Sequence, residues 1–421
     1  MITLQAFIRA FLARRSFNNQ VQSEFDQLFG SNSDSAVKKT SIDCFRLFDI
    51  AQRLVFIVRR ELLSRRLVKV GHDGYVDNSC RIPSGSAFSL FDSTQNDGKN
   101  ATVTIWQQLE SLCKHIVMSL FSEDPNTSYI GIIVLKPEMT AIWTRQITHI
   151  TTIACTFLRH LKPELANHHG SVATFLNVLV CFTSTSSWKV LKTAEYERYR
   201  HSLEQICHKV TNQLVHSGLY HCMNDLLLRG LTRTKPSLKK TSITAIITVS
   251  TRPMQCSSYA DQHVQSFVLH IFSVPALIWH LNHISPDAVQ IFYREPILKR
   301  IIELLAADDH SRVVFATLEG NYTLCLMANL VHLAFTSLKF IRPHVIDFVV
   351  SCLPLRESFQ SNLTIFFVVV QCVLKKMLDS CQKYVLSKQS SISHWHPVLG
   401  WFSQNVDQKY CSFVYSSDYH C

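Results

Sequence analysis

Glycine and proline are scarce in this chain, at 11 and 12 residues of 421. Both residue types form the tight turns that join short strands, so their scarcity argues against a protein built from many hairpins. The charged share is low at 17%, while 47% of the residues are hydrophobic, which excludes a chain that is disordered throughout. The composition therefore predicts a large core of long helices, and the fold class expected is all-α.

The sequence also lacks cysteines at metal-ligand or redox spacing. Its 14 cysteines include no Cys-x-x-Cys pair, and many lie inside apolar runs, where a free cysteine packs like a small hydrophobic residue. Adjacent histidines such as His168 and His169 have no cysteine or carboxylate at zinc spacing. We therefore expect no metal site and a reducing, cytoplasmic setting.

Motifs that carry catalysis are missing as well. The chain has no glycine-rich phosphate loop and no Gly-x-Ser-x-Gly elbow. The net charge of +11 comes from scattered basic residues, which favours a solvated basic face over a nucleic-acid groove. The longest apolar stretch, residues 363–374, contains Gln371 and is too short to cross a bilayer. The sequence thus predicts no catalytic residue, no cofactor, no nucleic-acid partner and no membrane span.

Apolar residues recur at steps of three and four over most of the chain, which is the spacing of one face of a helix. The predicted helices cover residues 4–15, 40–67, 103–121, 138–161, 171–182, 196–216, 218–230, 262–282, 286–306, 312–338, 343–353 and 363–386. Helix pairs of this length build HEAT and armadillo solenoids, but no fixed repeat period is visible here. Two architectures stay open: an irregular helical array and a HEAT/armadillo-like solenoid.

Breaks in the helical pattern suggest a division of the chain. Residues 68–101 are rich in Gly, Ser, Asn and Asp, which is typical of a mobile surface loop. The predicted parts are a first helix at 1–17, a helical segment at 18–67, the flexible loop at 68–101, a helical scaffold at 102–410 and a divergent tail at 411–421.

The first helix matches the spacing of an IQ motif, a calmodulin-binding pattern. That pattern asks for an aliphatic residue followed by Gln, an Arg four residues after the Gln, a small residue, and a basic residue four further on. An amphipathic helix of this kind places its apolar face in the groove of a calmodulin lobe, while its arginines meet the acidic rim. The predicted calmodulin-binding residues are Leu4, Gln5, Ile8, Arg9, Ala10, Phe11 and Arg14, with Ala10 where Gly is more usual.

Two other interpretations of this first helix stay open. It could simply dock on the core. It could also be a mitochondrial presequence, because the chain has no acidic residue before Glu24 and such presequences are basic and amphipathic. The second interpretation would make the location mitochondrial.

Four ordered segments resemble one family, and the IQ helix precedes them all. They are Ser184–Leu191 with its Trp-Lys pair, Phe267–Leu277, Leu318–Met327 and the aromatic stretch His394–Asp407. Together they resemble the HECT-type ubiquitin-protein ligases that carry an N-terminal IQ motif. The resemblance runs from about residue 4 to residue 407.

The resemblance implies a part in protein ubiquitination, with protein substrates as partners. The family's active-site cysteine lies in a Thr-Cys-Phe context inside a HECT domain, and neither has a counterpart in this sequence. The chain is therefore expected to be a substrate- or regulator-binding scaffold without its own transfer site, and whether it is an enzyme in any form stays open. A stand-alone helical scaffold without ligase function is the alternative.

Overall fold

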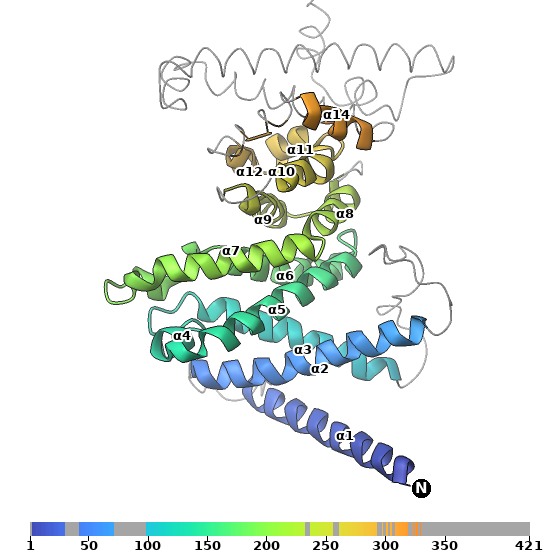
Figure 1. Ribbon diagram of the computed structural model, residues 1–421, viewed down its shortest axis with the longest axis vertical. Helices are drawn as coiled ribbons and strands as arrows, with labels where there is room; N and C mark the ends of the chain where they lie inside the picture. The colour runs from blue at the N-terminus through green and yellow to red at the C-terminus, as the bar shows by residue number, and fades with distance from the viewer. Residues whose placement is uncertain are drawn as a thin grey trace, which may run out of the picture. The chain divides into compact units, whose positions relative to one another are not determined.

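The computed structural model describes residues 2–29, 42–70, 98–231, 236–255 and 261–292, and then positions 297, 300, 301, 304, 308–318, 322, 325, 326 and 329. Within these residues the secondary structure is helical and no strand occurs, which confirms the predicted all-α class and an irregular array (Figure 1). The chain divides into two compact units, the first made of 1–161 and 170–214, the second of 162–169 and 215–421.

The first unit is organised around helix α2 (Cys44–Val70), which contacts α1 (Ile2–Phe29), α3 (Gly98–Ser119), α4 (Gly131–Leu135) and α5 (Thr140–His160). The apolar stripe of α2 is buried along its described length: Cys44, Leu47, Phe48, Ala51, Leu54, Val55 and Val58. The buried amide of Gln146 on α5 donates to the carbonyl oxygen of Phe48 over 3.0 Å, so a polar contact also joins the two helices. The unit is completed by α6 (His169–Phe182) and most of α7 (Arg200–His216).

Helix α5 shows how the sequence pattern produces this packing. Its buried residues Trp143, Ile147, Ile150, Ala154 and Leu158 follow one another at steps of four, three, four and four, which is one helical face. Its threonines satisfy their hydroxyls by donating to carbonyl oxygens one turn earlier, as Thr151 does to Ile147 over 2.9 Å. The predicted helix at 138–161 is thus confirmed.

The second unit contains α8 (Leu219–Leu231), α9 (Lys240–Thr251), α10 (Asp261–Phe267), a π-helical turn (Val268–Phe272), α11 (Leu277–Ile284), α12 (Pro286–Phe292) and α14 (Asp308–Thr317). Helix α9 packs against α8 and α12, and the π-helical turn packs against α8. Helix α12 begins with Pro286 at its first position, as the sequence predicts.

Two predictions for this unit are wrong, and one helix was missed. The helix predicted over residues 312–338 instead begins at Asp308 and ends at Thr317, before a bend at Leu318. Residues 262–282 are not one helix: the chain leaves the helical path at 273–276, where Pro275 cannot continue the hydrogen-bond ladder and Ala276 has a left-handed φ of 54°. Helix α9 was not predicted. Its sequence is rich in Thr, Ile and Val, whose branched side chains favour strands, and burial of its apolar face overrides that preference.

Several predictions fall on residues outside the described ones, namely helices 343–353 and 363–386, the segment 394–407 and most of the loop at 68–101. Helix α2 extends to Val70 and α3 begins at Gly98, so the ends of that predicted loop are helical. Among the described helices, none is by itself long and apolar enough to cross a membrane; Asp261–Phe272 and Leu277–Ile284 meet that test only as a pair bent by 72°.

Candidate functional site

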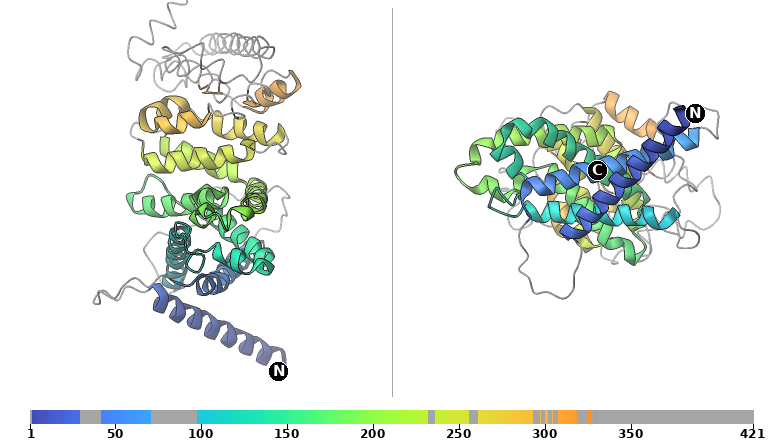
Figure 2. Two further views of the ribbon diagram at one scale, coloured as in Figure 1. Left: turned by 90° about the vertical axis from the view of Figure 1, so that its left-hand side faces the viewer. Right: turned by 90° about the horizontal axis from the view of Figure 1, so that it is seen from below.

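Helix α1 contains the predicted calmodulin-binding residues and is a single 28-residue helix. Apolar residues at helical spacing and the absence of Gly and Pro over this length favour a long helix. It ends at Phe29, one residue before Gly30, a residue type that commonly follows a helix end. In Figure 1 and in the left view of Figure 2, its first turns extend away from α2.

The first half of α1, residues 2–16, presents its described side chains to solvent. Gln5, Arg9 and Arg14 are exposed, and Ala10 is half-buried. The side chains of Phe11 and Leu12, which follow each other in sequence, are each 55% exposed. The backbone of Leu4 and Ile8 is helical as predicted, whereas their side chains lie outside the described ones.

The second half of α1, residues 17–29, packs against α2. Val21 and Phe25 are 1% and 5% exposed. The ring of Phe17 meets the ring of Phe56 on α2 edge-on, with 6.1 Å between centroids. This aromatic contact marks the point along α1 at which packing on the core begins.

Polar contacts also fix the position of this second half of α1 along α2. Arg53 of α2 donates from Nη1 to a carboxylate oxygen of Glu24 over 2.7 Å, and Arg60 donates from Nη2 to Oδ1 of Asn18 over 3.1 Å. Glu24, the first acidic residue of the chain, is therefore paired within the fold. The exposed half of α1 contains basic residues and no acid, which leaves it with a positive charge.

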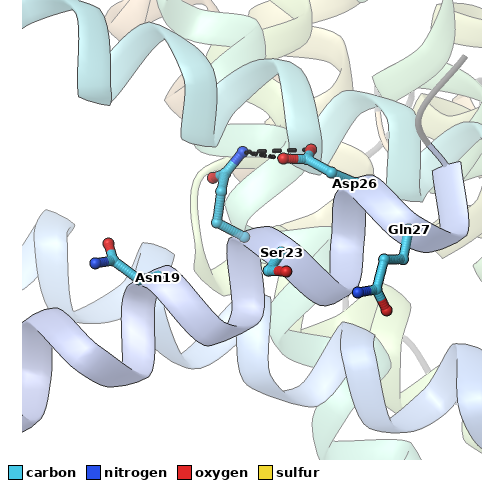
Figure 3. Close-up of a pocket in the computed structure, with 5 residues that line it drawn as sticks. Asn19, Ser23, Asp26 and Gln27 are labelled. Atoms are coloured by element: carbon cyan, nitrogen blue, oxygen red, sulfur yellow. Dashed lines mark hydrogen bonds between the residues drawn. The ribbon is translucent and has the colours of Figure 1, made fainter.

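A shallow surface depression lies on the solvent side of the second half (Figure 3). It is lined by Asn19, Gln22, Ser23, Asp26 and Gln27, all from α1. The amide of Gln22 donates to both carboxylate oxygens of Asp26, over 3.3 and 3.4 Å. Because all five lining residues come from one helix, the described residues do not give this depression the converging polar groups of a small-molecule site.

The described cysteines are suited to packing and not to nucleophilic chemistry. All seven are buried, and none of them forms a disulfide. Burial raises the pKa of Cys44 to about 11 and the pKa of Cys113 and Cys325 to about 12, from a usual value of 9.0. Such thiols stay protonated near neutral pH, whereas the thiolate is the nucleophilic form.

Histidines in the described part serve local structure. His168 is 3% exposed, and its Nδ1 accepts from the backbone N–H of Lys162 over 3.0 Å. His169 contacts the carbonyl oxygen of Pro163 over 2.9 Å. No group of three or more His, Cys, Asp or Glu side chains at metal-binding distance occurs among the residues that the structure describes.

The segments that carry the family resemblance pack the core where the structure describes them. Trp188 is 1% exposed, and its Nε1 donates to the carbonyl oxygen of Cys181 over 2.9 Å. Its ring lies edge-on to that of Trp143, with 6.1 Å between centroids. Phe267 and Phe272, from the second segment, are fully buried in the second unit. In these two segments the described aromatic residues therefore pack the core.

Comparison with known proteins extends the resemblance to nearly the whole chain. The chain is 32% identical over 407 residues to a mouse (Mus musculus) protein named ubiquitin-protein ligase E3B, and 31% identical over 407 residues to the human (Homo sapiens) protein of the same name. The match covers 96% of this chain and 32% of each relative, so the chain spans about a third of their length. No protein-family model matches the chain. No solved structure matches it either.

Proposed function

We propose, on the basis of its relationship to ubiquitin-protein ligase E3B, that this chain acts in protein ubiquitination as a helical scaffold that binds substrate proteins and a regulator. The relationship covers almost every residue, and the described residues form helices with buried thiols. Because the chain spans only about a third of its relatives, transfer of ubiquitin is not assigned to it.

We propose calmodulin as the regulator, bound through the first half of α1. The observation that carries this proposal is a helix with exposed Phe11 and Leu12 beside exposed Arg9 and Arg14, with no acidic residue before Glu24. Apolar anchors flanked by basic side chains suit a partner that offers an apolar groove with an acidic rim. Charge complementarity of this kind speeds association and selects against basic partners.

Calorimetric titration of the chain with calmodulin, with and without calcium, tests this proposal. The double variant Arg9→Glu and Arg14→Glu should weaken binding at least tenfold, because it reverses both exposed charges. Arg46→Glu serves as the control, since Arg46 is exposed on α2 away from the motif. Wild-type protein that binds calmodulin in neither condition would refute the assignment.

The absence of transfer activity can be tested directly. The chain is incubated with ubiquitin-charged conjugating enzyme and analysed with and without a reducing agent. We expect no adduct, because the described thiols are buried and burial raises the pKa of Cys44, Cys113, Cys181 and Cys325. A ubiquitin adduct that the reducing agent removes would show that the chain contains a transfer cysteine.

A cytoplasmic location is part of the proposal. The seven described cysteines form no disulfide, which agrees with a reducing compartment. The mitochondrial alternative makes a different prediction for the N-terminus of the mature protein. Sequencing the purified cellular protein should give the intact first helix, and a mature start near residue 20 would support a cleaved presequence instead.

A further inference from the structure

The exposed apolar stripe of α1 and its α2-contacting face point in different directions around one helix axis. An α-helix turns by roughly 100° per residue. The angle around the helix axis between the two faces, averaged over the pairs Phe11–Val21 and Leu12–Phe25, is roughly 110°. The exposed side chains of the first half are therefore not a continuation of the face that packs on α2.

A break in the helix does not cause this difference in direction, because α1 is continuous from Ile2 to Phe29. Described contacts with α2 lie at Phe17, Asn18 and Glu24, which meet Phe56, Arg60 and Arg53 of α2. Residues 2–16 extend roughly 22 Å along the axis, which is about four turns. Among the described side chains, Phe11 and Leu12 are exposed on these turns, N-terminal to those contacts.

We infer that calmodulin binds one side of residues 4–16 while α1 remains packed on α2 through residues 17–29. This inference rests on the proposed function and adds the mode of binding: the regulator docks on the folded scaffold and does not pull α1 away from it. The charges support this division. The exposed arginines lie in the free half, whereas Glu24, which would oppose an acidic partner, lies in the packed half and pairs with Arg53, which also contacts Asp49.

The competing mode is release of α1 from α2 before binding. Release would expose Val21 and Phe25 and break the Glu24–Arg53 pair, so the binding-competent state would be rare in the free protein. The apparent affinity would then fall by the fraction of competent molecules, and any change that loosens α1 would strengthen binding. The two modes thus predict opposite responses to the same variants.

The first experiment weakens the α1–α2 contact in the full chain. Val21→Ala and Phe25→Ala each remove buried apolar atoms, and calorimetry measures the dissociation constant for calmodulin. Docking without release predicts a change of less than threefold, together with a lower melting temperature that shows the contact was weakened. Binding that becomes tenfold tighter would overturn the inference and leave calmodulin binding itself established.

The second experiment compares the same charge on two sides of the free half. Leu12→Glu places it in the exposed stripe, and Ala6→Glu places it roughly 170° around the helix from the middle of that stripe; both positions are exposed. One-sided docking predicts at least a tenfold loss for Leu12→Glu and less than threefold for Ala6→Glu. Equal losses would mean that the partner surrounds the helix, and no binding by wild-type protein would remove the proposed function as well.

Discussion

Two regions of the molecule differ in how they satisfy polar groups and expose apolar ones. One is the first half of α1, and the other is residues 268–278 of the second unit. We call this second region the joint. Residues 2–16 form an unbroken helix that satisfies its own backbone and leaves Phe11 and Leu12 in solvent. The joint is buried, and there the chain leaves the helical path between Phe272 and Leu277. Its freed backbone groups need partners from elsewhere, because a buried polar group without a hydrogen bond is costly.

One side chain from a distant part of the sequence provides those partners. Asn329 is 0% exposed, and its Nδ2 donates to the carbonyl oxygens of Phe272 and Val274 over 2.8 and 2.7 Å. Its Oδ1 accepts from the backbone N–H of Ile278 over 3.1 Å. The joint therefore depends on specific polar contacts for its stability, while the free half of α1 has surface available for binding at little cost in stability.

The largest expected effect comes from removing the amide at the joint. Asn329→Leu keeps a similar volume but leaves the carbonyl oxygen of Phe272 and the N–H of Ile278 without this partner, at about 1–3 kcal/mol for each buried group, whereas the carbonyl oxygen of Val274 still accepts from the N–H of Leu277. We expect the second unit to lose roughly 2–6 kcal/mol and the Ile278 amide to exchange with solvent much faster, as measured by hydrogen exchange. Unchanged protection of Ile278 would show that the joint does not depend on Asn329.

The next largest effect is a loss of stability at low pH, caused by His270 in the joint. Burial, and secondly the nearby His221, lowers the pKa of His270 from 6.5 to about 4, and their ring centroids are 4.1 Å apart. Between these pH values the unfolded chain takes up a proton that the folded chain does not. Stability is therefore complete above pH 6.5 and falls by about 2–3 kcal/mol as the pH drops to 4.

Other histidines contribute to the same titration, so a variant must isolate His270. The pKa of His263 is lowered by burial and by His216, and that of His280 is lowered to about 4 by burial and by His283. Urea unfolding of wild type and His270→Gln, measured from pH 7 to pH 4, gives the contribution of His270 as a difference. Identical slopes for both proteins would contradict the expected role of this residue.

The same two regions show how far the sequence predicts the structure. Helical spacing suffices for α2 and α5, because a regular face repeats within one segment, whereas for α1 it predicted only residues 4–15 of a helix that continues to Phe29. It fails for α9, where branched residues favour a strand locally and contacts with α8 and α12 determine the outcome. It also fails at the joint, since Asn329 follows Val274 by 55 residues and no local pattern indicates their contact.

The sequence likewise predicted one part of the candidate site and not another. The spacing of Gln5, Arg9 and Arg14 indicates an IQ helix, and the structure shows these side chains to be exposed. Which face of α1 packs on α2 was not predictable, because that depends on Phe56, Arg53 and other groups of a second helix. The direction of the exposed stripe could therefore be obtained only from the structure.

A smaller effect, of opposite sign, is expected at Ala276. Its left-handed φ of 54° is unfavourable for a residue with a Cβ, so Ala276→Gly should stabilise the chain by about 0.5 kcal/mol. Ala154→Gly in α5 removes the same atoms from a regular helix and should destabilise by about 1 kcal/mol or more. Thermal unfolding of both variants checks the signs, and destabilisation of equal size in both would argue against strain at the joint.

The smallest change in stability is expected in the free half of α1. The double variant Phe11→Gln and Leu12→Gln replaces side chains that are 55% exposed, so the free energy of unfolding in urea should change by no more than about 0.5 kcal/mol. Val21→Gln, on the same helix, buries an amide where the native side chain is 1% exposed and should cost about 2–3 kcal/mol. A loss above 1 kcal/mol for the double variant would mean that the stripe packs on the core, and α1 would then be a docking helix whose apolar face is unavailable to calmodulin.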